Sequence, residues 1–437
     1  MTRDHDANAA AGVEKQASDP LGFWQHSHPL RSVLASEMHL RHLPRFTAPA
    51  KILQIVILVD EPGSASSRVH IQSLAPSNDA SLPLDTKHAV VPLGLQTLVW
   101  ERHTEFVTYT VIDENPPEAT FDATSFAEAR RLIGDLPGQI VRATQIILLS
   151  RNDPGPPPEF LSGSFDADAL VVCDIAGGKA RIWSDFQLHA DGLGRLLIAD
   201  RGLCDGETQR SVQSLQELGN YRNMALLGLP VAQQLAPEVT RLEQDLAELT
   251  GRLADPDNTD EPLLDDLTNL SAELARLLAQ TRYRMSATRA YAQICADRLA
   301  GLQVRSIDGH QTLSEFTDRR LVPAVRTCLS FIERVEELSQ RASWTSGLLR
   351  TRIDTALARQ NRDLLAAMNR RTQLQLRLQQ AVEGLSVVAI SYYLVALIGY
   401  ATLLLPLKHD MILAVAAPFC VLISAIALGR TKKSLLE

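Results

Sequence analysis

The chain has 437 residues and a formal net charge of −8 at pH 7, which disfavours a general nucleic-acid binder because such proteins present a basic surface. Without the first 20 residues and the apolar C-terminal segment, roughly 360 residues remain, enough for two or three folded units of about 150 residues each. The five cysteines form no CxxC pair, which disfavours a zinc site or a disulfide framework and fits a reducing compartment. They are Cys173, Cys204, Cys295, Cys328 and Cys420.

Residues 1–20 are polar, charged and without periodicity, so we expect a disordered tail. They contain no apolar stretch of the kind found in a signal peptide, and we therefore expect the bulk of the chain to stay in the cytoplasm.

Residues 21–204 are predicted to form a mixed α/β cytoplasmic domain in which strands predominate. Short runs rich in β-branched residues, bounded by turn signals, are typical of strands. These runs are Ile52–Val59, Leu98–Ile112 (a long strand or a hairpin arm), Ile140–Leu149 and Leu170–Cys173, followed by a hairpin turn at Gly177 and Gly178. Phe126–Ile133 has helical spacing and is the one clear helix expected here.

Residues 205–382 are predicted to form a helical stalk. Apolar residues spaced three and four apart lie on both sides of a polar break, which indicates two antiparallel helices with coiled-coil packing. They are Val239, Leu242, Leu246, Leu249 and Leu253 before Asp255–Pro262, and Leu263, Leu267, Leu270, Leu274 and Leu277 after it. Thr312 and Glu315 form a capping-box pattern. No proline occurs between Pro323 and Leu405, which predicts a helix of about 120 Å.

Two uncharged runs follow, Gly384–Leu407 and Met411–Leu428. A helix needs about 20 apolar residues to cross the roughly 30 Å of bilayer hydrocarbon, so we predict two membrane spans. The predicted fold class is α+β: a mixed α/β domain, an antiparallel helical stalk and a C-terminal two-helix transmembrane hairpin. The expected bounds are 1–20, 21–204, 205–382, 383–407 and 411–429, with a basic cytoplasmic tail at 430–437.

Basic residues orient the predicted hairpin. Arginines precede the first run and basic residues follow the second, whereas the connecting turn has only Lys408. Because positive residues remain on the cytoplasmic side, both termini are expected in the cytoplasm. The flanking residues are Arg370, Arg371, Arg377, Arg430, Lys432 and Lys433.

Several stretches carry a family resemblance. They are His28-Pro29-Leu30-Arg31, Glu37-x-His39-x-Arg41, Trp100 to Phe106, Arg350 to Asp354, Gln360-Asn361, Met368 to Arg371, and Gln375 through Val382 to Ser386 and on to Tyr392-Tyr393. In these motifs the chain resembles a bacterial family of uncharacterised membrane-anchored proteins, a domain-of-unknown-function family of DUF3422 type. His42 departs from the family pattern, which usually has proline there. The resemblance implies the architecture and the bacterial inner membrane, and it brings no known activity.

The expected plan is also similar, by analogy only, to that of CorA-type magnesium channels, which combine a cytoplasmic α/β domain, a stalk helix and two C-terminal spans. That family carries a Gly-Met-Asn signature near the outer end of the first span, where this chain reads Leu403 to Lys408 without a substitute. The alternative function is therefore a CorA-like divalent-cation channel or transporter that lacks this filter.

Glu101, His103 and Glu105 are the candidate metal ligands. Alternate side chains of a strand share a face, so a strand here would place two carboxylates and an imidazole together. Such ligands suit a divalent metal, and they also suit a hydrogen-bonded polar face. No other cofactor is expected. Arg102, between them, is suited to bind an anion through both arms of its guanidinium.

A second candidate site is rich in imidazole. His39 and His42 are three residues apart and would share a helix face. Because this segment and the one around Arg102 both carry the family resemblance, we expect them to meet, as an interdomain contact or as a small-ligand site. The residues are His26, His28, Glu37, His39, Arg41 and His42.

Nucleotide-binding motifs are incomplete, which disfavours an enzyme. A phosphate loop at Gly178-Lys179 would need glycine where Cys173 stands, and Gly192-x-Gly194 lacks a third glycine at Leu197. Amides just before the first apolar run are suited to set the register between helices, and they predict self-association. They are Gln360, Asn361, Asn369, Gln373, Gln375, Gln379 and Gln380. The expected function is a membrane-anchored cytoplasmic scaffold or sensor whose partners are the lipid bilayer and further copies of itself.

Overall fold

The computed structural model describes residues 27–31, 34–35, 43–74, 86–114, 116, 118–204, 206–255, 259–402 and 409–435. The chain divides into two compact units. Residues 1–245 and 272–339 form the first, which we call the sheet unit. Residues 246–271 and 340–437 form the second, which we call the helical unit.

The sheet unit is built on eight strands in the order β2-β3-β4-β1-β5-β8-β7-β6. The pair β5–β8 is parallel, and the other neighbouring pairs are antiparallel. The strands are β1 (Ala50–Leu58), β2 (His88–Leu93), β3 (Gln96–Arg102), β4 (Phe106–Asp113), β5 (Gln139–Leu149), β6 (Val171–Ile175), β7 (Ala180–Ser184) and β8 (Gly194–Asp200).

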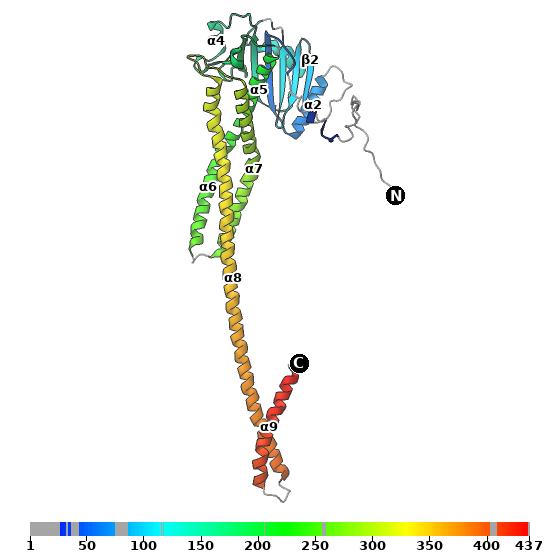
Figure 1. Cartoon of the computed structure of the whole chain (residues 1–437), viewed down its shortest axis with the longest axis vertical. Helices are drawn as coiled ribbons and strands as arrows, with labels where there is room; N and C mark the ends of the chain where they lie inside the picture. The colour runs from blue at the N-terminus through cyan, green and yellow to red at the C-terminus, as the bar shows by residue number, and fades with distance from the viewer. Residues whose placement is uncertain are drawn as a thin grey trace, which may run out of the picture. The chain divides into compact units, whose positions relative to one another are not determined.

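Both faces of the sheet carry buried apolar clusters. Neighbouring residues of a strand point to opposite faces, so they enter different clusters. Ile146 of β5 joins the core beneath α5 (Glu207–Leu226), which also takes residues from α7 and from the start of α8. The next residue, Ile147, lies in a smaller cluster on the other face. On that face, α2 (Glu61–Leu74) and α3 (Ala127–Ile133) contribute to the core over β3 and β4. Figure 1 shows α5 against the sheet.

The apolar runs predicted most of the central strands, and β1, β5, β6 and the β6–β7 hairpin are confirmed. The segment Leu98–Ile112 is two antiparallel strands, β3 and β4, joined by a tight turn at residues 103–105. The prediction that Glu101, His103 and Glu105 lie along one strand is therefore wrong, because the strand ends at Arg102. The helices α2 and α4 (Pro158–Ser164) and the strands β2 and β8 were not predicted.

Three long helices follow, α6 (Gly228–Ala254), α7 (Asp260–Gly301) and α8 (Leu313–Thr402). Within the sheet unit, ion pairs join Glu238 of α6 to Arg276 of α7, and Glu243 of α6 to Arg334 of α8 (2.7 Å). The predicted capping box is confirmed: Thr312 N donates to Glu315 Oε2 (2.9 Å), and Glu315 N donates to Thr312 Oγ1 (3.1 Å).

The helical unit contains the end of α6, the start of α7, most of α8, and α9 (His409–Leu435). Arg352 of α8 joins these elements, because its Nη1 donates to the carbonyl of Leu253 (3.0 Å) and its Nε lies 3.0 Å from Asp260 Oδ1. The two predicted leucine-rich helices are confirmed as α6 and α7, whereas coiled-coil geometry and self-association stay predictions. The fold is thus α+β, with an N-terminal sheet and a long C-terminal helix.

The end of α8 is apolar and exposed. By length and composition, α8 is the one helix in the described ranges that is able to cross a membrane, and only 6% of its apolar window is buried. A shorter apolar stretch, Leu413–Ala427, lies in α9. Length and composition alone therefore indicate membrane association, and the two-helix transmembrane hairpin stays a prediction.

Candidate functional site: a cavity with two partly buried arginines

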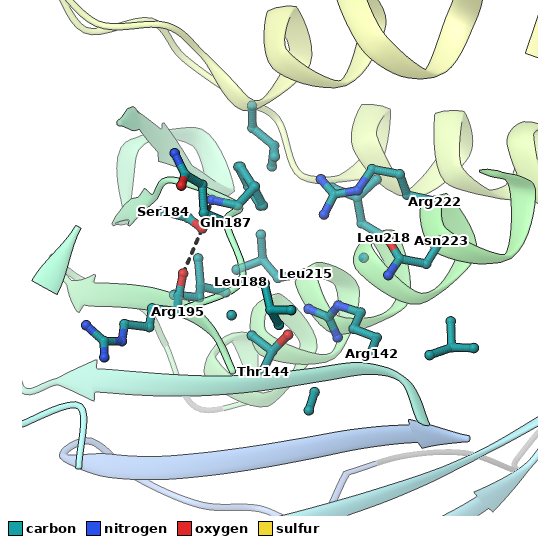
Figure 2. Close-up of a pocket in the computed structure, with 17 residues that line it drawn as sticks. Arg142, Thr144, Ser184, Gln187, Leu188, Arg195, Leu215, Leu218, Arg222 and Asn223 are labelled. Atoms are coloured by element: carbon teal, nitrogen blue, oxygen red, sulfur yellow. Dashed lines mark hydrogen bonds between the residues drawn. The ribbon is translucent and has the colours of Figure 1, made fainter. Parts of the chain in front are cut away.

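A cavity of about 290 Å³ opens within the sheet unit. Its walls are residues 141–144 of β5, the start of β8, the β7–β8 loop (residues 185–193), residues 215–223 of α5, and Leu313 at the start of α8. Figure 2 shows the side chains of Arg142 and Arg222 turned toward this space, whereas the guanidinium of Arg195 points away from it.

Arg142 is held in place by neutral partners. Its Nη1 donates to Gln54 Oε1 and to Asn220 Oδ1, both at 2.9 Å. Burial, and then the nearby charge of Arg222, lowers the pKa of the Arg142 guanidinium to about 9. The amide oxygens orient the guanidinium without neutralising its charge.

Gly219 of α5 makes room for Arg142. A Cβ at this position would lie 2.7 Å from Arg142 Nη2 and 2.8 Å from its Cζ and Nε. Real Cβ contacts essentially never come so close, so the guanidinium occupies space that only a glycine leaves free. Glycine, the smallest residue, thus lies in α5 at the point where the Arg142 side chain from β5 packs against this helix.

Arg222 approaches the cavity from α5. Its guanidinium carbon lies 4.6 Å from the ring centroid of Phe186 and 5.6 Å from that of Phe316, within the range of cation–π attraction. Its Nη1 is buried and has no hydrogen-bond partner among the described residues. Burial is the main cause that lowers the pKa of Arg222 to about 10.

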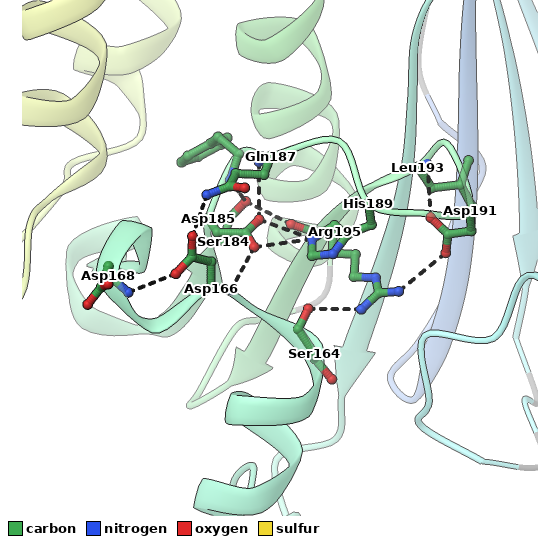
Figure 3. A network of polar contacts seen from close by, with 11 residues as sticks. Ser164, Asp166, Asp168, Ser184, Asp185, Gln187, His189, Asp191, Leu193 and Arg195 are labelled. Atoms are coloured by element: carbon green, nitrogen blue, oxygen red, sulfur yellow. Dashed lines mark hydrogen bonds and ion pairs between the residues drawn. The ribbon is translucent and has the colours of Figure 1, made fainter.

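A polar network holds the β7–β8 loop, which forms one wall of the cavity (Figure 3). The buried Asp185 accepts hydrogen bonds from the backbone N of Asp166 (3.0 Å) and of Gln187 (3.2 Å), and its Oδ2 lies 3.1 Å from His189 Nε2. Phe186 has a φ of 54°, a strained conformation for a bulky residue. Such strain persists where surrounding contacts hold it, and here it places the Phe186 ring against Arg222.

The predicted metal residues lie elsewhere in the sheet unit, at the β3–β4 turn. His103 N donates to the carbonyl of Phe106 (2.9 Å), which closes a two-residue turn of Thr104 and Glu105. The imidazole of His103 stacks on the Phe106 ring, with centroids 4.1 Å apart. The turn therefore does not place residues 101, 103 and 105 on one face of a strand.

The carboxylates of Glu101 in β3 and of Glu105 in the turn have separate partners. Glu101 accepts from Thr108 Oγ1 (3.3 Å), and Glu105 forms an ion pair with Arg284 of α7. Burial, and then the Glu105 carboxylate, raises the pKa of Tyr291. Among the described residues, no three His, Cys, Asp or Glu side chains form a group able to hold a metal ion. A metal at Glu101, His103 and Glu105 stays a prediction.

The second predicted site is described only in part. His28 is exposed, and its Nδ1 accepts from the backbone N of Leu30 (3.1 Å). Glu37, His39 and Arg41 lie outside the described residues, as do His26 and His42. Arg102 ends β3, where its backbone N donates to the carbonyl of Lys87 (2.8 Å). The expected meeting of the two segments stays a prediction.

Sequence reasoning missed the cavity, although one signal was present. Arg142 interrupts the apolar strand Gln139–Leu149, and Arg222 lies on a helix that has ten buried residues. A charged residue within a buried element is rare unless it is paired. That signal marks each arginine separately and does not reveal that the fold brings them together.

The comparisons with known proteins concern the whole chain. No curated protein matches it. The sequence model of a family described as "Protein of unknown function (DUF3422)" matches residues 26–435. The match brings no activity, ligand or channel-like plan with it. It covers nearly the entire length and agrees with the motifs that carry the resemblance, and the chain therefore belongs to this family of proteins of unknown function.

Proposed function

We propose that this protein is a membrane-anchored scaffold or sensor, in which the apolar end of α8 and the apolar stretch Leu413–Ala427 of α9 enter the bilayer and the sheet unit works in the cytoplasm. One observation carries the proposal. The single helix α8 contributes Leu313 and Phe316 to the core of the sheet unit, and its far end is the apolar window that is suited to a membrane. A change in the sheet unit has a continuous helix through which to act.

The exposed side chains near the end of α8 support membrane insertion. Leu385, Tyr392, Leu397 and Tyr400 are each at least 70% exposed. Leaving a large apolar side chain in water rather than burying it costs about 1.5–3 kcal/mol. Contiguous apolar surface of this kind marks a membrane or protein contact, and the absence of charge along the window favours the membrane.

Small residues support a packed pair of helices at this end. In the apolar part of α8 and α9, which cross in Figure 1, the buried side chains include Ser391, Cys420 and Ser424. Helices in lipid approach closely through such residues, because lipid tails are as apolar as leucine and give helices little other reason to associate. We infer that α8 and α9 form a transmembrane hairpin.

The α8 surface before the membrane supports self-association. Leu357, Leu364 and Leu378 follow one another at spacings of seven and fourteen residues, and Met368 and Val382 lie four residues beyond the second and third of them. All five side chains are more than half exposed. They form a heptad seam that is interrupted by Asn361, Arg371 and Gln375, and its apolar side chains have no partner among the described residues. We infer that a second copy of α8 covers the seam.

Topology tests the proposal in bacteria. We expect both termini in the cytoplasm and the α8–α9 connection outside, because basic residues flank the apolar runs at 370–377 and 430–433. Alkaline phosphatase fused at residue 409 should be active, whereas a fusion at residue 437 should be silent. A protein that carbonate releases from membranes, or an active fusion at residue 437, would overturn the proposal.

A further inference from the structure

We propose that the cavity between β5, the β7–β8 loop and α5 binds a small organic anion through Arg142 and Arg222. The proposal goes beyond membrane anchoring, because every lining residue belongs to the sheet unit. Anion binding at this cavity does not depend on α9 or on the apolar window of α8, so its test is separate from the test of membrane anchoring.

Charge is the first argument. Two guanidinium groups line one cavity, and neither forms an ion pair with a carboxylate of the described residues. A partly buried charge without a counter-charge is unfavourable, and two like charges in one cavity add to that cost. An anion in the cavity would neutralise both groups and remove the penalty.

Hydrogen-bond geometry is the second argument. Gln54 and Asn220 engage Nη1 of Arg142, so they fix the plane of the guanidinium. Arg222 is fixed by the rings of Phe186 and Phe316, and its Nη1 remains buried and unpartnered. Buried donors are normally satisfied, so an orphan donor beside an open cavity indicates a missing acceptor.

Space is the third argument. A Cβ at Gly219 would lie 2.7 Å from Arg142 Nη2, so the glycine leaves the room that the Arg142 guanidinium needs in the wall of the cavity. The strained Phe186 holds the second arginine from the opposite wall. Gly219 and Phe186 thus each position one of the two guanidinium groups.

The walls define the class of ligand. Leu188, Leu215 and Leu218 line the cavity beside the two arginines. A volume of about 290 Å³ is near the lower limit of ligand pockets, which span about 300–1,000 Å³. The ligand class is therefore a compact molecule with a short apolar body and either one phosphate head or two carboxylate heads, which match the two positive charges, since a guanidinium binds either head through two parallel hydrogen bonds.

Calorimetric titration of the purified full-length chain in detergent tests the proposal, with inorganic phosphate and succinate as probes and sodium chloride matched for ionic strength. We expect saturable binding of at least one probe. Phosphate alone would assign a phosphate head, and succinate alone a carboxylate head. Arg142→Gln and Arg222→Gln should each weaken binding at least tenfold. The control Arg210→Gln, an exposed arginine on the same helix, should leave binding unchanged.

A further variant keeps the test decisive if a glutamine variant folds poorly. Arg222→Lys keeps the charge and loses the forked donor, so binding should weaken while the circular dichroism spectrum stays that of the wild type. The proposal would be overturned if neither probe bound saturably, or if the wild type and the Arg222 variants bound a probe equally well.

Discussion

Gly219→Ala is the most informative single substitution, because it adds one methyl group against one guanidinium. The new Cβ would lie within 2.8 Å of three atoms of Arg142, so the arginine must move. Movement breaks its hydrogen bonds to Gln54 and Asn220, both 2.9 Å long. A hydrogen bond to a charged group contributes about 1.5–3 kcal/mol, so losing two costs about 3–6 kcal/mol.

Alanine also favours the helix. Replacing glycine by alanine in a helix interior stabilises it by about 0.5–1 kcal/mol. The expected net loss for Gly219→Ala is therefore about 2–5 kcal/mol. Gly163→Ala is the matched control: that exposed glycine of α4 lies in the same unit and has nothing within 4 Å of an added Cβ. It should leave stability unchanged or slightly raised.

Hydrogen exchange in urea, read on peptides from β5 and α5, measures this loss in the sheet unit itself. A double-mutant cycle with Arg142→Gln identifies the cause. If the guanidinium is what the methyl group meets, Gly219→Ala should cost much less in the Arg142→Gln background. An equal cost in both backgrounds would refute the reasoning, because the added methyl would then disturb something other than Arg142.

Three further predictions follow. His103→Ala removes the stack of the imidazole on the Phe106 ring, so the melting temperature should fall by the equivalent of about 0.5–1.5 kcal/mol, and the wild type should release no metal on unfolding. Stoichiometric metal in the wild type that is lost in His103→Ala, with the metal-free stability unchanged, would contradict this prediction. Hydrogen bonds from the Cys204 backbone and Lys179 lower the pKa of Glu207 to about 2, so its stabilisation is complete above about pH 4.5 and is lost as the pH falls toward 2. Melting temperatures from pH 6 to pH 2 should therefore show Glu207→Gln less stable than the wild type at pH 6 and equal to it at pH 2, and a constant gap would count against the linkage. In a Cys204→Ser background, Gln375→Cys on the α8 heptad seam should crosslink copies in membranes and Asn369→Cys should not, whereas equal or absent crosslinking at both positions would remove the argument for a paired α8.

Local patterns in the sequence determined much of the secondary structure. The spacing of leucines predicted α6 and α7, and the Thr312–Glu315 pair predicted the start of α8. Runs of β-branched residues predicted β1 and β5. These signals succeed because each depends on residues a few positions apart, which meet within a single helix or strand whatever the rest of the chain does.

Other elements were decided only by tertiary contacts. The strands β2 and β8 were not predicted, and they pair with β3 and with β5 and β7. The turn at His103 is closed by a local hydrogen bond to Phe106, and the Phe106 ring packs against Tyr221 and Tyr291 of helices distant in the sequence. The strand pairing depends on segments far apart in the chain.

The cavity is the clearest case. Gln54 and Asn220 lie 88 and 78 positions away from Arg142 in the chain, and no local pattern relates them to it. The sequence by itself determined that an arginine interrupts an apolar strand and that a glycine lies within α5. Only the packing of α5 on β5 brought that glycine against that arginine and a second arginine into the same cavity, because long-range burial decides which side chains lose their contact with water.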